Sequence, residues 1–177
     1  MGTHIHGHRF LRCWLFTIEE RRGKMRAITV YQPYAFEIVA GLKQYETRPR
    51  RTNIRGRVAI HAAKTDIWVE RLITLKDIQE HSKMLLEYQL KQANGAVRVP
   101  SMLVFSAVIG TVEIVDCVPV EALIGKLSER EQVLGDYTPG RFAWVLKNPI
   151  MFDKAIPARG KQGWWNWDEN SLQLKNI

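Results

Sequence analysis

The chain has 177 residues, 46% of them hydrophobic, and 26 Lys and Arg outnumber 18 Asp and Glu to give a formal net charge of +8. This length and composition predict one globular domain, and the two cysteines exclude a disulfide framework, so we expect a reducing compartment such as the cytoplasm. No apolar run reaches the roughly 18 to 20 residues of a membrane span, and no membrane partner is expected. The basic excess favours a polyanionic partner without identifying one.

The first 24 residues differ from the rest of the chain. They hold His4, His6 and His8 but show neither strand alternation nor helical periodicity, whereas a clear strand pattern begins at Arg26. We hypothesise that Met25 is the biological start, that residues 1–24 are a non-native or disordered upstream extension, and that the single domain covers 25–177. The histidines of this extension lack the fixed geometry of a metal site, and we predict no metal site.

Alternation of apolar and polar residues predicts extended segments along the body of the chain. They cover, in chain order, 26–31, 44–48, 57–61, 104–118 and 142–146. Gly110 falls inside the fourth segment, where a glycine is typical of a β-bulge.

Helical patterns lie between these strands. Pro33 suits the first turn of a helix expected over 34–42, and leucines spaced among charged residues predict a helical insertion around 66–93. Ser128 and Glu131 form a capping box for a further short helix. Because strands outnumber helices and their connections are irregular, we predict an α+β fold, namely a small mixed β-barrel capped by helices.

The densest group of charged residues follows the first predicted helix. On an extended chain Glu46 and Arg48 share one face, so a salt bridge between them is expected. One interpretation is a surface ion pair beside a solvated basic loop. The other is a cleft in which Lys43 and Glu46 meet a ligand while arginines hold its phosphates. The basic run continues with Arg50, Arg51, Arg55 and Arg57.

A second group of candidate residues lies near the carboxyl terminus. Two glycines flank Lys161 and would let the backbone approach a ligand closely. Trp164 and Trp167 have helical spacing and, like Trp144, are expected in the core. Trp165 points elsewhere and is the candidate for stacking on a base.

Several of these motifs, taken together, resemble the ASCH domain family. They are Gln32-Pro33-Tyr34-Ala35, Gly41-x-Lys43-x-x-Glu46-x-Arg48, Ile60-His61-Ala62, Gly140-Arg141-x-Ala143-Trp144 and Lys161-Gln162-Gly163-x-Trp165. The resemblance runs from about Met25 to Trp167. It implies a PUA-like barrel with a cleft beside the first helix, and an association with RNA or other nucleic acid.

The leading hypothesis is therefore a domain that binds RNA or a modified nucleotide in this cleft. The sequence has no phosphate-binding glycine loop, Rossmann fingerprint or serine-hydrolase elbow, so we expect no cofactor. No oligomeric state follows from the sequence. Ligand contacts are expected from Gln32, Lys43, Glu46, Arg48, Arg50, Arg51, Arg55, Lys161 and Trp165.

Two alternatives stay open. In the first, Lys43 and Glu46 are catalytic, in an amidohydrolase acting on N-acylated cytidine-type nucleosides or in a ribonuclease whose base is Glu46 or His61. The resemblance to the amidohydrolase branch is incomplete, because its nucleophilic threonine is replaced by Glu46, with Thr47 adjacent, and its distant glutamate could be Glu129 or Glu131. In the second alternative, the domain is a protein adaptor in an RNA-processing or transcription complex and uses the helical insertion.

Overall fold

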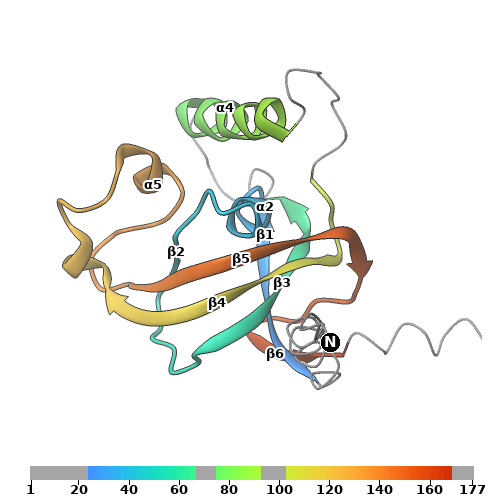
Figure 1. Cartoon of the computed structure of the whole chain (residues 1–177). Helices are drawn as coiled ribbons and strands as arrows, with labels where there is room; N and C mark the ends of the chain where they lie inside the picture. Colours follow the sequence, from blue (N-terminus) through green and yellow to red (C-terminus); the bar gives the residue numbers. More distant parts are fainter. Residues whose placement is uncertain (1–23, 67–74, 93–102, 169–177) are drawn as a thin grey trace, which may run out of the picture.

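A computed structural model describes residues 24–66, 75–92 and 103–168 (Figure 1). The predicted upstream extension lies outside these ranges apart from its last residue, so the hypothesis on the start of the protein stays a prediction. None of the helices in the described part is long and apolar enough to cross a membrane.

The fold is built on one six-stranded mixed sheet (Figure 1). The strand order is β2-β5-β4-β3-β1-β6, and β1 and β3 are parallel while the other neighbours are antiparallel. All five predicted extended segments are strands of this sheet. The bounds are β1 Met25–Gln32, β2 Tyr45–Arg48, β3 Gly56–Asp66, β4 Ala107–Pro119, β5 Phe142–Pro157 and β6 Trp164–Trp167.

Alternation along the strands divides the core between the two faces of the sheet. Ile28 and Ile60 belong to the main hydrophobic cluster, whereas Ala27 and Ala59, one residue earlier on each strand, belong to a smaller cluster on the opposite face. Five of the six residues of the short helix α2 (Tyr34–Val39) are buried, and Ala35, Ile38 and Val39 among them belong to the main cluster. Its end precedes the predicted one at residue 42, because Gly41 adopts φ +74° and stops the helix.

The sheet curves but is not closed into a barrel by backbone pairing. Register shifts break the ladders beside Gly110, as predicted, and a Cβ there would lie 2.2 Å from the Ile150 carbonyl oxygen. Curvature brings the two ends of the sheet together through side chains, since Trp144 of β5 stacks on Trp164 of β6 with ring centroids 5.2 Å apart. The predicted mixed α+β architecture is confirmed, while "barrel" describes this open sheet only approximately.

The predicted helical insertion contains α4 (Leu75–Gln92), which lies beyond α2 from the sheet (Figure 1). It docks on α2 through two contacts: buried His81 Nδ1 lies 2.5 Å from Glu37 Oε1, and half-buried Tyr88 contacts Phe36 edge-to-face. The insertion begins later than predicted, because residue 66 still belongs to β3. A 3₁₀ turn, η1 (Val120–Leu123), and α5 (Glu129–Val133) follow β4.

The predicted cap of α5 is formed only in part. Ser128 Oγ accepts a hydrogen bond from the Glu131 backbone N–H, as a capping box requires. The Glu131 carboxylate, however, turns to β2 and accepts hydrogen bonds from the backbone N–H groups of Gln44 and Tyr45. The cap therefore ties α5 to the edge of the sheet.

The helical spacing read for the C-terminal tryptophans is wrong, because these residues form strand β6. Trp165 and Trp167 consequently share one face of the sheet and are buried in the smaller cluster, whereas Trp164 points to the other face and stacks on Trp144. The expected core positions of Trp144 and Trp167 are confirmed.

Candidate functional site

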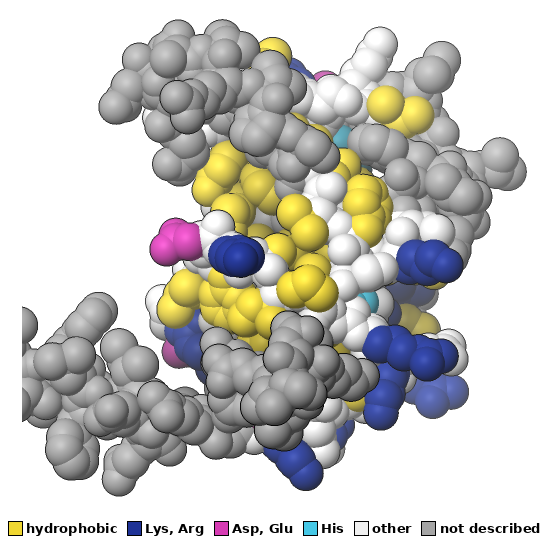
Figure 2. Space-filling model, turned by 90° about the vertical axis from the view of Figure 1, so that its right-hand side faces the viewer, with side chains coloured by type: hydrophobic (Ala, Val, Ile, Leu, Met, Phe, Trp, Pro, Cys, Tyr) yellow, Lys and Arg dark blue, Asp and Glu magenta, His cyan; other side chains and the backbone are white. Residues whose placement is uncertain are grey.

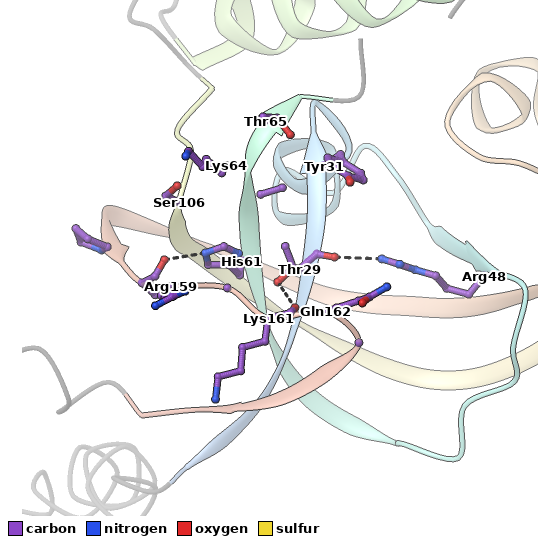
Figure 3. A pocket seen from close by; sticks show the side chains of 15 residues that line it. Thr29, Tyr31, Arg48, His61, Lys64, Thr65, Ser106, Arg159, Lys161 and Gln162 are labelled. Carbon is purple, nitrogen blue, oxygen red and sulfur yellow. Dashed lines mark hydrogen bonds between the residues drawn. The ribbon is translucent and has the colours of Figure 1, made fainter. Parts of the chain in front are cut away.

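Between β1, β3 and the segment that leads into β6 lies a groove of about 950 Å³, which we call the basic groove (Figure 3). It forms because β6 pairs with β1 only as far as Ile28. The next residues of β1 lack this neighbour, and the segment 157–163 crosses over that gap. The lining residues are Thr29, Tyr31, Arg48, His61, Ala63, Lys64, Thr65, Ser106 and 157–163.

Hydrogen bonds from both side chains and backbone hold the crossing segment in place. Thr29 Oγ1 donates to the Lys161 carbonyl oxygen at 2.9 Å, and the Ala158 N–H donates to the Ser106 carbonyl oxygen at 3.0 Å. Trp165 Nε1 donates to Thr29 Oγ1 at 3.3 Å and so supports the wall from behind. These hydrogen bonds attach the wall of the groove directly to the sheet.

His61 forms the floor of the groove and is 2% exposed. Its Nε2 lies 2.9 Å from the Ala158 carbonyl oxygen, and since a carbonyl only accepts, Nε2 carries the proton. Burial lowers the pKa of His61 below its ordinary value, so the ring is neutral at pH 7. Gly160 packs directly on this ring, and a Cβ there would lie 2.3 Å from His61 Cε1.

The charged side chains that line the groove are all positive. Arg48, Lys64, Arg159 and Lys161 line it, and no carboxylate is found among the described lining residues. The last three are exposed at the rim. Figure 2 shows the uneven placement of charge on one face of the molecule, where Lys and Arg side chains gather at the right-hand edge and hydrophobic side chains fill the middle.

A second set of charged groups lies inside the protein, and we call Lys43, Glu46 and Glu131 the buried charge cluster. Lys43 is 3% exposed; its Nζ donates to the Leu134 carbonyl oxygen and lies 3.9 Å from Glu46 Oε2. Burial lowers the pKa of Lys43, although Glu46 and Glu131 oppose this shift. Burial also raises the pKa of Glu131, against hydrogen bonds from the backbone N–H groups of Gln44 and Tyr45.

Arg48 connects the buried charge cluster to the basic groove. The predicted salt bridge with Glu46 is confirmed, with Arg48 Nε 2.8 Å from Glu46 Oε1. The Nε–H bond is not directed at that oxygen, so the contact is an ion pair without a well-formed hydrogen bond. Glu46 is 8% exposed, which contradicts the interpretation of this pair as a surface ion pair.

The other predicted ligand contacts lie in different places. Gln32 is fully buried, where it donates to the Val104 carbonyl oxygen and accepts from the Phe36 N–H. Arg55 pairs with Asp116 at 3.2 Å on the surface. Arg50 and Arg51 are exposed, and Trp165 is buried behind the wall. Of the nine predicted residues, Arg48 and Lys161 line the groove.

Sequence reasoning missed two of the four groove cations, Lys64 and Arg159, and the polar side chain of Thr29. Both cations stand next to motifs that were recognised, since Lys64 follows Ile60-His61-Ala62 and Arg159 precedes Lys161 by two residues. The positive charge of residues next to these two motifs is the signal by which the sequence could have identified Lys64 and Arg159. No group of three or more His, Cys, Asp or Glu able to hold a metal ion occurs in residues 24–66, 75–92 and 103–168.

The fold and the site define an α+β domain in which a curved, PUA-like sheet carries a basic groove. The family model described as "ASCH domain" matches residues 28–156, and the chain belongs to this family.

Relatives and solved structures are similar to this chain at low identity. The human protein "Activating signal cointegrator 1" is 24% identical over 146 residues, which cover 82% of this chain and 23% of that protein; the mouse protein of the same name is 23% identical over the same shares. This chain thus spans less than a quarter of their length. The crystal structure of ASCH from Zymomonas mobilis has 19% identity and a TM-score of 0.46, over 86% of this chain and 94% of that one.

Proposed function

We propose that this domain binds single-stranded RNA, or a modified nucleotide derived from it, in the basic groove. The observation that carries the proposal is the lining itself, with four cationic side chains and no carboxylate among the described lining residues. Three of these cations, Lys64, Arg159 and Lys161, face solvent and have no ion pair among the described residues. Such cations lower the free energy of a bound polyanion, because the phosphates replace weakly held counterions. Membership of the ASCH family supports the same ligand class.

The size of the groove favours a nucleotide or a short stretch of chain over a simple anion. Its volume of about 950 Å³ lies at the upper end of the roughly 300 to 1,000 Å³ typical of ligand pockets. The rim cations Lys64, Arg159 and Lys161 would neutralise phosphates. Arg50, Arg51 and Arg55 would extend the basic surface, and Trp165 would support the wall without stacking on a base.

The test is the binding of a fluorescein-labelled single-stranded octaribonucleotide, measured by anisotropy between 50 and 200 mM salt (about the range in which phosphate contacts dominate affinity). Lys161→Ala should weaken binding and reduce the slope of log Kd against log salt by about 0.7, because one phosphate contact is lost. Lys126→Ala is the matched control, since this exposed lysine hydrogen-bonds the Ala122 carbonyl oxygen outside the groove. Equal affinities for all three proteins, or no binding at all, would refute the proposal.

A second candidate function is supported by the buried charge cluster. An amidohydrolase acting on acylated nucleosides would need an amine of lowered pKa and a carboxyl group close to it. Lys43, whose pKa is lowered, and Glu131, which interacts with it electrostatically, would supply these two groups. Catalysis there would require the substrate to reach groups that are buried. The same incubations, analysed by mass spectrometry with N4-acetylcytidine and with RNA, test this candidate: product that Lys43→Met abolishes, in a protein that still melts cooperatively, would favour an enzyme. The adaptor alternative would leave both assays without signal.

A further inference from the structure

We infer that Arg48 is the base-reading residue of the basic groove, with a preference for guanine, and that Glu46 positions it. This inference rests on the proposed function and adds specificity to it. It also assigns Glu46 a role behind Arg48 instead of the direct ligand contact that the sequence suggested.

The guanidinium of Arg48 is held from three directions. Glu46 Oε1 lies 2.8 Å from Nε, Nη2 donates to the Thr29 carbonyl oxygen at 3.3 Å, and the Trp144 ring lies beneath it with its centroid 5.9 Å from Cζ. Glu46 is in turn fixed by the Lys43 ammonium, 3.9 Å away. An arginine restrained in this way presents its remaining donors in one orientation, which recognition of a particular base requires.

Arg48 differs from the other cations of the groove in position as well as in restraint. Its side chain is 32% exposed. The side chains of Lys64, Arg159 and Lys161 are exposed, and no ion pair to any of them is found among the described residues. Lys64 and Arg159 lie at the end of the groove opposite Arg48, and the side chain of Lys161 points away from Arg48 (Figure 3). Flexible exposed cations suit phosphates, whereas the restrained, partly buried fork suits a base.

The chemistry of the fork selects the base. Both N–H bonds of Nη1 and one of Nη2 make no hydrogen bond among the described residues, so Arg48 offers donors and no acceptor. Guanine presents two adjacent acceptors, O6 and N7, whereas adenine presents N7 beside an amino donor. Cytosine places an amino donor at the corresponding edge, and uracil has a single carbonyl there. Guanine is therefore the base that the fork fits.

The experiment compares octaribonucleotides of uridine that contain one central replacement. Guanosine should bind roughly tenfold more tightly than adenosine, the discrimination that one bidentate pair supplies. Inosine keeps both acceptors and should bind like guanosine, whereas 7-deazaguanosine lacks N7 and should bind like adenosine.

Three variants separate base reading from charge. Arg48→Lys keeps the positive charge but lacks the fork, so the guanosine preference should vanish while the salt slope stays the same. Glu46→Gln keeps the size of the side chain but removes the charge that holds Nε, and the preference should fall at an unchanged salt slope. Lys161→Ala should weaken all octamers equally and reduce the slope. Thermal melts identify any variant that fails to fold, in which case the base analogues with the unaltered protein decide the question.

Two results would overturn the inference while leaving the proposed function intact. One is RNA binding with equal affinity for the guanosine, adenosine and 7-deazaguanosine octamers. The other is a folded Arg48→Lys protein that keeps the full preference for guanosine. Absence of RNA binding by the unaltered protein would instead refute the proposed function itself.

Discussion

The buried charge cluster and the basic groove are built from the same kinds of side chain but differ in solvation. In the cluster, Lys43 and Glu131 are buried and surrounded by partners. Burial lowers the pKa of Lys43 and raises that of Glu131, so it favours the neutral form of each. In the groove, Arg159 and Lys161 are exposed, with no carboxylate among the described lining residues. Buried charges depend on one another, because either one left unpaired would be costly, whereas exposed cations without a carboxylate nearby attract an anion. Glu46 and Arg48, two residues apart, mark the boundary between the two regions.

The largest effect is expected from breaking the buried cluster. Lys43→Ala should lower the free energy of unfolding by about 3 kcal/mol, because removal of one member of a buried ion pair leaves the other uncompensated. Lys161→Ala, the matched change in the groove, should alter it by less than about 0.5 kcal/mol. Urea denaturation of the two variants measures both values. Similar stability of both proteins would erase the distinction drawn between the regions.

A change at Gly160 should damage the groove with a smaller loss of stability. In Gly160→Ala the new Cβ would meet the His61 ring at 2.3 Å, so the segment 157–163 must move. We expect a loss of about 2 kcal/mol in unfolding free energy, typical of overpacking, together with weaker RNA binding. Gly56→Ala is the control: φ is +92° and the space around it is open, so backbone strain alone should destabilise the protein without changing RNA affinity. RNA binding by Gly160→Ala at full affinity would contradict the role given to this wall.

The cap of α5 tests how the cluster is covered. Ser128→Ala removes the acceptor for the Glu131 N–H and should lower the free energy of unfolding by about 1 kcal/mol. Because α5 leads into Leu134, whose carbonyl oxygen accepts from Lys43, hydrogen exchange should also become faster at Leu134 and at its neighbours. Ser82→Ala on the exposed side of α4 provides a control, expected within about 0.5 kcal/mol of the unaltered protein.

His61 combines features of both regions, since it is buried yet forms the floor of the groove, and it predicts a modest pH dependence. Its pKa is lowered in the folded state, so as pH falls from 7 the unfolded chain gains a proton before the folded protein does. The free energy of unfolding should therefore decrease on acidification.

His61→Gln keeps a donor for the Ala158 carbonyl oxygen and should lose this part of the pH dependence. The raised pKa of Glu131 contributes with the opposite sign in both proteins and cancels in their difference. Urea unfolding at several pH values supplies the comparison, and identical pH profiles for the two proteins would show that His61 is not the responsible group.

Much of the fold could be predicted from local patterns. Alternation located five of the six strands, Gly110 marked the bulge, and Ser128 marked the start of α5, because each of these signals depends on residues close in sequence. Because Glu46 and Arg48 share one face of an extended chain, their ion pair could also be predicted. The C-terminal tryptophans were misjudged because three-residue spacing fits a helix, whereas pairing with β1 imposes a strand.

The candidate site could be predicted only in part. Arg48 and Lys161 were recognised from motifs, but Lys64 and Arg159 join them only because β3 and the segment 157–163 meet beside β1. Likewise, nothing local distinguishes a buried Lys43 from an exposed one.

The sequence by itself determined the family, the order of the strands along the chain, the caps and the surplus of positive charge. Only the tertiary structure decided which of those charges face each other and which face solvent. The physical reason is that solvation and pairing depend on residues far apart in the chain: Glu131 and Leu134 enclose Lys43 from some 90 positions away, whereas Lys161 is held at the open rim by the hydroxyl of Thr29.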